Sequence, residues 1–482
     1  INNQIMKTLK YISLMIITFL FVNCDSFIEE EPISVITSNS FWKTPADAQA
    51  GVIGAYDKLQ QIYRSEFGEF IHWTDGRSDV VKAGQSDAAS FTESVISNNL
   101  KPTTIGTDWS YLYQAINMAN LALKNIPNIN MDAAAKEKLL GEAYFIRAYS
   151  YFMAARVWGD VPLIIEAVDD SKVNLKPTRT ARAVVLDQVR KDIESALSRV
   201  PASYGSPVSD RGRATTGVVS ALKVDFLLWM ARVENSGNTD LLAAANTAAT
   251  LLANPMYTMV NNFKDIFTVK NNSETIWAIQ YSLGSQESRN LGADTTPLAQ
   301  GPYTGGKMYY QLSNKVINAY ANAPATDLRA AATFVSFNGL GATNMCIKYI
   351  GSPGQGTQRN FDSNILIYRV GGMKLMYAEA LNELGRTPEA IIQLDNVRNR
   401  AGLPGTVAVT QVEVRQAILD ENLVELPLEG SRWFTLVRSG RISQEVPNIL
   451  TNVFNESSKL LWPISETSLR QNENLTQNGA YK

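Results

Sequence analysis

Histidine and cysteine are almost absent from this chain of 482 residues. His72 is the single histidine, so a metal site built from several histidines is excluded, and a Ser-His-Asp or Cys-His triad would have to use this residue. The two cysteines, Cys24 and Cys346, form no CxxC pair, which leaves a structural zinc site without support. We therefore predict no metal-binding residue, and the sequence leaves open whether a structural Ca²⁺ is bound.

Signals for nucleotides and nucleic acids are missing as well. The sequence has no GxGxxG dinucleotide fingerprint, no P-loop and no nucleophile-elbow motif. It contains no run of lysine and arginine, and its net charge of −2 gives no general attraction to nucleic acid. We expect neither a cofactor nor a nucleic-acid partner.

The N-terminal residues have the pattern of a targeting segment. Lys7 and Lys10 precede an apolar run over residues 11–22, which is too short to span a membrane as a stable helix. Cys24 follows in LFVNC, which resembles the cleavage box of bacterial lipoproteins. Residues 1–23 are therefore predicted to be a lipoprotein signal peptide and Cys24 the lipidated residue, with simple cleavage as the alternative. Cys346 would then have no disulfide partner and is expected to fill core space.

The longest helical signal covers residues 141–165, GEAYFIRAYSYFMAARVWGDVPLII. Its apolar side chains lie on more than one face, which is typical of a helix buried among other helices. Glu142, Arg147 and Arg156 interrupt the apolar run and argue against a membrane span. Gly159 can supply the positive φ at which such a helix ends.

Further helices are expected along most of the chain. Thr44 and Pro45 suit the start of one, and Gly385 and Pro388 suit a turn between two others. The remaining helices are predicted at residues 109–126, 181–200, 215–233 and 239–253. Small residues in these stretches allow helices to approach closely, in the manner of degenerate tetratricopeptide pairs. The predicted fold is an all-α, tetratricopeptide-like scaffold of helix pairs with long loops and a few short strands, over residues 36–253 and 365–460.

Two stretches lack helical periodicity and carry the candidate binding residues. Residues 254–364 form a predicted loop-rich insert with a short strand at 275–281, and residues 64–107 resemble a loop. Aromatic rings stack on the C–H faces of sugars, and polar side chains in loops bind hydroxyls. The predicted ligand-binding residues are Trp73, Asp75, Arg77, Asp79, Trp109, Tyr281, Tyr303 and Tyr309. The alternative for the tyrosines near 309 is that they anchor the helix expected at 313–321.

Several stretches together resemble one family. Besides residues 141–165, these are SNSFWKTPADAQAGVIGAYDKLQ near the N-terminus, and ILDENLVELPLEGSRWFTLVRSGR and LLWPISETSLRQNENLTQNGAY near the C-terminus. All of them are similar to segments of the SusD/RagB family, with departures at Asn422, Thr435, Glu473 and Ala480. The resemblance implies a single SusD-like domain over residues 24–482, with four helix pairs forming a right-handed scaffold. Within it, Glu425, Glu429, Arg432 and Arg438 are interpreted as a buried ion-pair network rather than a catalytic acid pair.

The resemblance also implies a function. Members of this family are outer-membrane lipoproteins of Bacteroidetes, and the acidic residues after Cys24 resemble the signal that sends such proteins to the outer face. We therefore expect a lipid-anchored protein that faces the cell exterior, binds a glycan without cleaving it and delivers it to a SusC-like TonB-dependent channel. Three alternatives stay open: peptide capture in the RagB manner, a glycoside hydrolase with paired carboxylates, and a scaffold for protein partners only.

Overall fold

The computed structural model describes residues 41–64, 69–84, 90, 92–169, 174–285, 291–338, 341–446 and 457–482. The expected signal peptide and the expected lipidation site, Cys24, lie outside the described residues.

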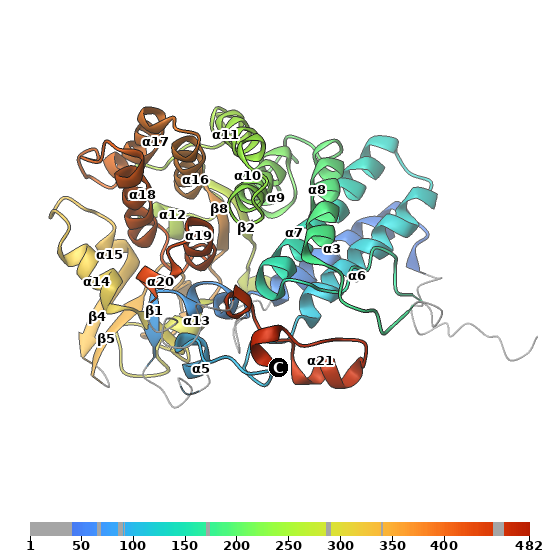
Figure 1. Ribbon diagram of the computed structural model, residues 1–482, viewed down its shortest axis with the longest axis horizontal. Coiled ribbons are helices and arrows are strands. Elements are labelled where there is room, and N and C mark those ends of the chain that lie inside the picture. The colour runs from blue at the N-terminus through green and yellow to red at the C-terminus, as the bar shows by residue number, and fades with distance from the viewer. Residues whose placement is uncertain are drawn as a thin grey trace, which may run out of the picture.

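Long helices in the described residues pack as four pairs. The pairs are α3 (Pro45–Gln61) with α6 (Ser110–Asn125), α7 (Ala133–Trp158) with α8 (Arg182–Leu197), α10 (Thr216–Arg232) with α11 (Asn238–Leu252), and α16 (Val370–Glu383) with α17 (Thr387–Arg400). Neighbouring pairs touch through α6 and α7, α8 and α10, and α11 and α16, and α18 (Gln411–Glu425) packs on α16. The pairs form a row from α3 to α18 (Figure 1). The predicted all-α scaffold of helix pairs is confirmed.

Helix α7 is buried along most of its length because α3, α6 and α8 all pack against it. The charged residues in its apolar run join it to its neighbours. Arg147 pairs with Asp192 of α8 at 2.8 Å, and Arg156 pairs with Asp225 of α10 at 2.9 Å. The helix ends where Gly159 takes a φ of 77°, as its sequence predicts.

Local signals set several helix boundaries. Thr44 and Asp47 form a capping box at the start of α3, and Gly385, with a φ of 76°, separates α16 from α17. The helix predicted at residues 239–253 is α11, which begins one residue earlier, at Asn238, with Gly237 in the cap position. Residues Pro207–Arg232, which include α9 (Pro207–Gly212) and α10, are long and apolar enough to cross a membrane, but 78% of the apolar window is buried inside the protein.

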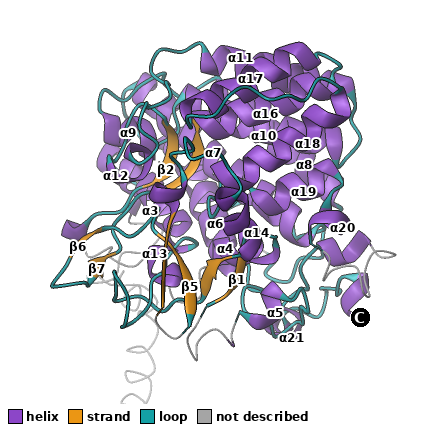
Figure 2. Cartoon of the chain, turned by 90° about the vertical axis from the view of Figure 1, so that its left-hand side faces the viewer, coloured by secondary structure: helices purple, strands orange, loops and turns teal. Residues whose placement is uncertain are grey.

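The insert at 254–364 consists of short elements linked by turns. They are α12 (Asp265–Thr268), β2 (Thr275–Ile279), α13 (Leu291–Thr295), β3 (Tyr310–Leu312), α14 (Asn314–Ala321), α15 (Ala330–Thr333), β4 (Phe334–Asn338), β5 (Ala342–Cys346), β6 (Ser352–Pro353) and β7 (Arg359–Asn360). The expected strand is β2, which pairs antiparallel with β8 (Ile365–Arg369) and so joins the insert to α16. Strands β5, β6 and β7 lie below the helix row, whereas β2 lies at the height of the helices (Figure 2). Cys346 is buried, as expected of a core residue.

The stretch at 64–107 is more structured than its sequence predicts. It contains α4 (Glu69–Trp73), the 3-10 turn η1 (Asp75–Arg77), β1 (Val81–Ala83), which pairs with β3, and α5 (Glu93–Ile96). The chain closes with α19 (Arg432–Ser439), α20 (Ile442–Glu445) and α21 (Glu466–Gln471). Contacts between η1 and α19 bring these two distant parts of the chain together.

A buried ion network joins the insert to the scaffold. Arg369, at the end of β8, pairs with Glu274 at 2.8 Å, Glu425 at 2.7 Å and Glu429 at 2.6 Å. Four more cations surround Arg369, and each of them pairs with at least one buried carboxylate. The described network consists of Arg329, Lys348, Arg369, Arg398 and Arg400 with Glu274, Asp327, Glu421, Glu425 and Glu429. The formal charges therefore cancel. Burial alone would raise the pKa of Glu425, but Arg400, Arg369 and Arg329 hold it well below its usual range.

The expected ion network near the C-terminus is thus confirmed for Glu425 and Glu429. The two arginines named with them lie in separate ion pairs. Arg432 pairs with Asp79 at 2.8 Å, and Arg438 pairs with Glu379 at 2.7 Å and with Asp225 at 3.3 Å. All of these partners hold one segment of the chain to another, which is a structural role.

Replacing Arg369 by Met should unfold the protein at a lower denaturant concentration, because Glu274, Glu425 and Glu429 lose their shared cation in a desolvated site. Breaking a buried ion pair from one side costs about 3–5 kcal/mol. Urea unfolding of the non-lipidated chain measures this loss. The matched control is Arg386→Met, whose exposed pair with Glu389 should leave the midpoint unchanged. An Arg369→Met midpoint equal to that of the control would contradict the structural role of the network.

Candidate functional site

The segment from Trp73 to Asp79 lies in the core instead of on a binding surface. Trp73 is fully buried, its ring meets Trp158 edge-on at 5.1 Å, and its Nε1–H donates to the carbonyl of Gly106 at 2.6 Å. Asp75 is also fully buried and accepts hydrogen bonds from the backbone N–H groups of Gly430 and Arg432, each at 3.1 Å. Burial raises the pKa of Asp75 to about 6. Neither side chain is open to a ligand.

Arg77 and Asp79 hold the C-terminal part of the chain. The Arg77 guanidinium lies over the Trp433 ring at 4.1 Å and donates to the carbonyls of Lys459 and Leu460, each at 2.9 Å. Burial alone would raise the pKa of Asp79, but its ion pairs with Arg432 and Lys315 hold it below the usual range. The sequence predicts a binding role for these two side chains; their partners give them a structural one.

Three of the predicted aromatic residues are buried too. The exposed fraction is 8% for Trp109, 3% for Tyr281 and 4% for Tyr309, so these rings offer no open face for stacking on a sugar. Tyr310, the neighbour of Tyr309, is fully buried in β3 directly before α14, which agrees with the alternative that these tyrosines anchor that helix. Of the predicted rings, only that of Tyr303 is partly exposed and lies on a cavity.

That cavity, here called the insert cleft, has a volume of about 590 Å³. Its lining comes from α12 and the residues that follow it, from the β6–β7 hairpin and from the loop that carries Tyr303. The end of β5 and residues of α15 and β4 complete the lining. Its lining residues are Lys264, Phe267, Thr268, Lys270, Tyr303, Ala331, Ala332, Val335, Ile347, Lys348, Ile350, Gly351, Ser352, Pro353, Arg359, Asp362 and Ser363.

Backbone contacts fix the tyrosine loop against the hairpin. The N–H of Thr304 donates to the carbonyl of Thr357 at 2.9 Å, and the N–H of Arg359 donates to the carbonyl of Thr304 at 3.1 Å. The hairpin needs glycine at Gly351, where φ is 65° and an added Cβ would lie 1.8 Å from the Asn360 carbonyl oxygen. Tyr303 is therefore presented on a braced loop. Such bracing gives a largely pre-formed site.

Aromatic and charged groups meet inside the insert cleft. The Arg359 guanidinium lies 5.2 Å from the centre of the Tyr303 ring. Lys270 donates to the carbonyl of Tyr281 at 3.0 Å and to Asp362 at 3.3 Å. Burial alone would raise the pKa of Asp362, but the N–H of Ser352 and the Lys270 ammonium hold it below its usual range. A polar solute with flat apolar faces fits this mixture of groups.

Lys348 connects the insert cleft to the ion network. Its ammonium lies 4.8 Å from the centre of the Phe267 ring and donates to Glu429 at 2.7 Å. Burial lowers the pKa of this lysine. The position of Phe267 in the cleft is thus tied to the same carboxylate that binds Arg369.

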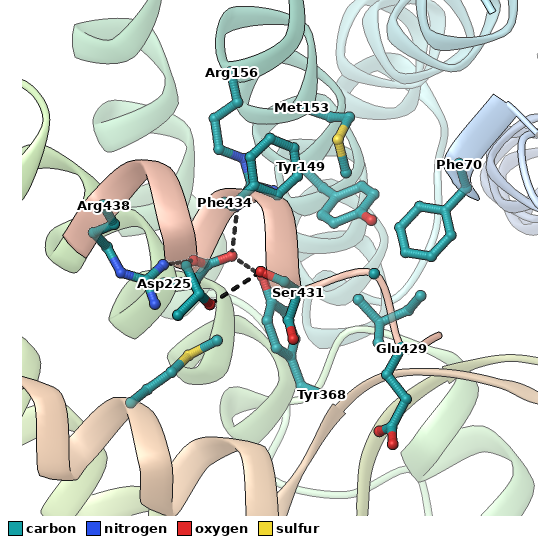
Figure 3. A pocket seen from close by; sticks show the side chains of 14 residues that line it. Phe70, Tyr149, Met153, Arg156, Asp225, Tyr368, Glu429, Ser431, Phe434 and Arg438 are labelled. Atoms are coloured by element: carbon teal, nitrogen blue, oxygen red, sulfur yellow. Dashed lines mark hydrogen bonds and ion pairs between the residues drawn. The ribbon is translucent and has the colours of Figure 1, made fainter. Parts of the chain in front are cut away.

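Two other cavities fit a ligand less well. The cavity in Figure 3 lies around Asp225, which binds Arg156, Arg438 and the Tyr368 hydroxyl, and its volume of about 40 Å³ suits a few waters. A groove of about 940 Å³ lies between α6, α7 and residues 163–169. Its cations are already paired, Lys124 with Asp169 and Arg147 with Asp192. The groove also has a partly exposed tyrosine, Tyr144, but the insert cleft differs in that two of its cations, Lys264 and Arg359, have no carboxylate partner among the described residues, which makes it the better candidate site.

Sequence reasoning missed most of the residues in the insert cleft. Lys264, Phe267, Lys270, Arg359 and Asp362 come from three separate segments, and no pattern along the chain joins them. One usable signal was the Gly-rich turn at residues 351–356, which is bounded by the polar residues of the hairpin. Within the described part of the chain, no group of three or more His, Cys, Asp and Glu side chains is arranged to hold a metal ion.

Comparisons with known proteins agree with this architecture. The family model described as "SusD family" matches residues 341–481, and the one described as "Starch-binding associating with outer membrane" matches residues 28–221. A SusD-like protein of Formosa agariphila is 32% identical, over 99% of this chain and 100% of the relative. Two solved structures show the same fold. NanU of B. fragilis has a TM-score of 0.78 at 24% identity, over 94% of this chain and 100% of its own. A laminarin-binding SusD-like protein has a TM-score of 0.75 at 22% identity, over 91% and 100%.

The fold and the cleft define a helical-repeat protein with a loop-rich insert that carries a surface site. Because the chain is similar to a SusD-like protein along its whole length, it belongs to the SusD/RagB family. This is a family of glycan-binding proteins associated with the outer membrane, so the expected family and fold are confirmed.

Proposed function

We propose that this protein captures an oligosaccharide in the insert cleft and holds it without cleaving it. The observation that carries the proposal is the partly exposed Tyr303 ring, which lies on the cleft beside Arg359 and is fixed by the backbone contacts of Thr304. The volume of about 590 Å³ lies within the range of roughly 300–1,000 Å³ that is usual for small-molecule sites. The laminarin-binding relative adds support for a glycan as the ligand.

The cleft offers what a sugar ring needs. The Tyr303 and Phe267 rings supply flat apolar surface for the C–H faces of a pyranose, and Thr268, Ser352 and Asp362 supply oxygen atoms for its hydroxyls. Asp362 is the one carboxylate among the described lining residues, and it is paired with Lys270. Glycoside hydrolysis usually requires two carboxylates that flank the bond, so the lining favours binding over catalysis.

Replacing Tyr303 by Ala should weaken glycan binding about three- to tenfold, because the loss of one aromatic stacking contact costs about 0.5–1.5 kcal/mol. The ligand is first chosen from a glycan array probed with the non-lipidated protein, and affinity is then measured by titration calorimetry. Tyr111→Ala is the matched control, since Tyr111 is a partly buried tyrosine on α6 that does not line the insert cleft.

An unchanged affinity in Tyr303→Ala would remove the insert cleft as the site. Release of sugar products by the pure protein would remove the binding-only mechanism. Binding of peptides, with no response on the glycan array, would favour the RagB-like alternative.

The proposal extends to the place of the protein in the cell. We propose that Cys24 carries the lipid, that the protein faces the cell exterior, and that it delivers its glycan to a SusC-like TonB-dependent channel. Support comes from the signal pattern before Cys24 and from the family description, which names the outer membrane. Several acyl chains on one residue give lasting attachment, whereas one chain gives marginal attachment.

Purification of the tagged protein from outer membranes in mild detergent should co-elute a TonB-dependent channel. Cys24→Ser should incorporate no labelled fatty acid and should leave the membrane fraction. Recovery of the native protein alone would contradict the partnership, and equal labelling of the two proteins would contradict the lipid site.

A further inference from the structure

We infer that the insert cleft selects glycans that carry anionic groups, either the carboxylate of a uronic acid or a sulfate ester. The inference rests on the proposed function and adds the chemical class of the ligand. It stands on the lining of the cleft, where Lys264, Lys270, Lys348 and Arg359 face a single carboxylate, Asp362.

Two of these cations are already neutralised by the protein. Lys348 is buried and donates to Glu429, and Lys270 pairs with Asp362 at 3.3 Å. Neither of them contributes uncompensated charge. The selectivity must therefore come from the other two.

Lys264 is the first uncompensated cation. Its side chain is exposed on the cleft wall at the start of α12, and no carboxylate of the described residues lies within ion-pair distance of its ammonium. A lysine in this position behaves as a mobile point charge with three hydrogen-bond donors.

Arg359 is the second uncompensated cation, and it is held in place. Its Nε–H donates to the carbonyl of Ile350 at 3.2 Å, its Nη2–H donates to the carbonyl of Gly351, and the guanidinium lies beside the Tyr303 ring. Its partners are carbonyls and a ring, none of which carries a formal negative charge. Nη1 is left to bind a ligand, and its planar donors suit a carboxylate or sulfate oxygen.

The two charges line the same cleft. Lys264 is the N-cap residue of α12 and Arg359 lies in β7, and the Phe267 and Tyr303 rings line the cleft with them. A sugar bound in the cleft is therefore exposed to the positive potential of both side chains. The whole chain carries a net charge of −2, so an attraction to anions must come from this local arrangement and not from the overall charge.

The test compares charged and uncharged polymers on the non-lipidated protein. Polygalacturonate and a sulfated galactan are the anionic probes, which distinguish carboxylate from sulfate, and laminarin and a neutral galactan are the uncharged probes. Affinity electrophoresis at low and high salt gives the relative affinities. Binding of at least one anionic probe should exceed that of the neutral probes and should weaken as salt rises.

Lys264→Gln should weaken anionic binding about two- to fivefold, in line with the loss of one exposed charge contact. Arg359→Gln should weaken it more, and Arg359→Lys should restore part of the loss. Lys138→Gln is the matched control, because Lys138 is an exposed lysine in the first turns of α7 that does not line the insert cleft. Melting temperatures show whether each variant is folded. If the Arg359 variants lose the hairpin structure, Lys264→Gln still tests the proposal, because Lys264 is exposed and its replacement should not disturb the fold.

The outcomes separate the two proposals. Binding of neutral glycans alone, with dependence on Tyr303, overturns the anionic selectivity and leaves the proposed function standing. An equal loss in Lys264→Gln and Lys138→Gln overturns the selectivity as well, since it shows unspecific attraction. A response to no glycan of either kind overturns the proposed function itself.

Discussion

The rest of the structure depends on the buried cluster of charges around Arg369. A guanidinium removed from water is tolerated only when carboxylates surround it with good geometry, and Glu274, Glu425 and Glu429 do this from two distant parts of the chain. Glu274 precedes β2 in the insert, whereas the other two lie at and beyond the end of α18. The insert cannot leave the scaffold without exposing or unpairing these charges.

The same cluster positions the candidate site. Glu429 binds both Arg369 and Lys348, and the Lys348 ammonium lies near the face of Phe267 on the insert cleft. A contact path therefore runs from the scaffold to the cleft lining. The paired charges in the interior fix the geometry of the insert cleft, and its cations without a carboxylate partner remain available to a ligand.

Sequence patterns predicted the scaffold well because its signals are local. The N-cap at Thr44, the glycine turns at Gly159 and Gly385, and the apolar α7 each depend on residues within a few turns of one another. The candidate site was harder to predict because its parts are distant. The turn-rich surroundings of Tyr303 indicate it as a candidate, but its neighbours on the cleft come from residues 264–270 and 347–363. The segment from Trp73 to Asp79 has the composition of a binding loop, and its burial follows from contacts with Gly430, Arg432 and Leu460, more than 350 residues away.

The central claim is that a glycan binds in the insert cleft and not at the buried aromatic segment or the groove beside α7. Hydrogen–deuterium exchange of the protein with and without its bound glycan tests this claim directly. We expect slower exchange at residues 264–270, 303–306 and 350–363, which line or brace the cleft, and unchanged exchange at 73–79. Protection confined to 73–79 or to residues 163–169 would contradict it.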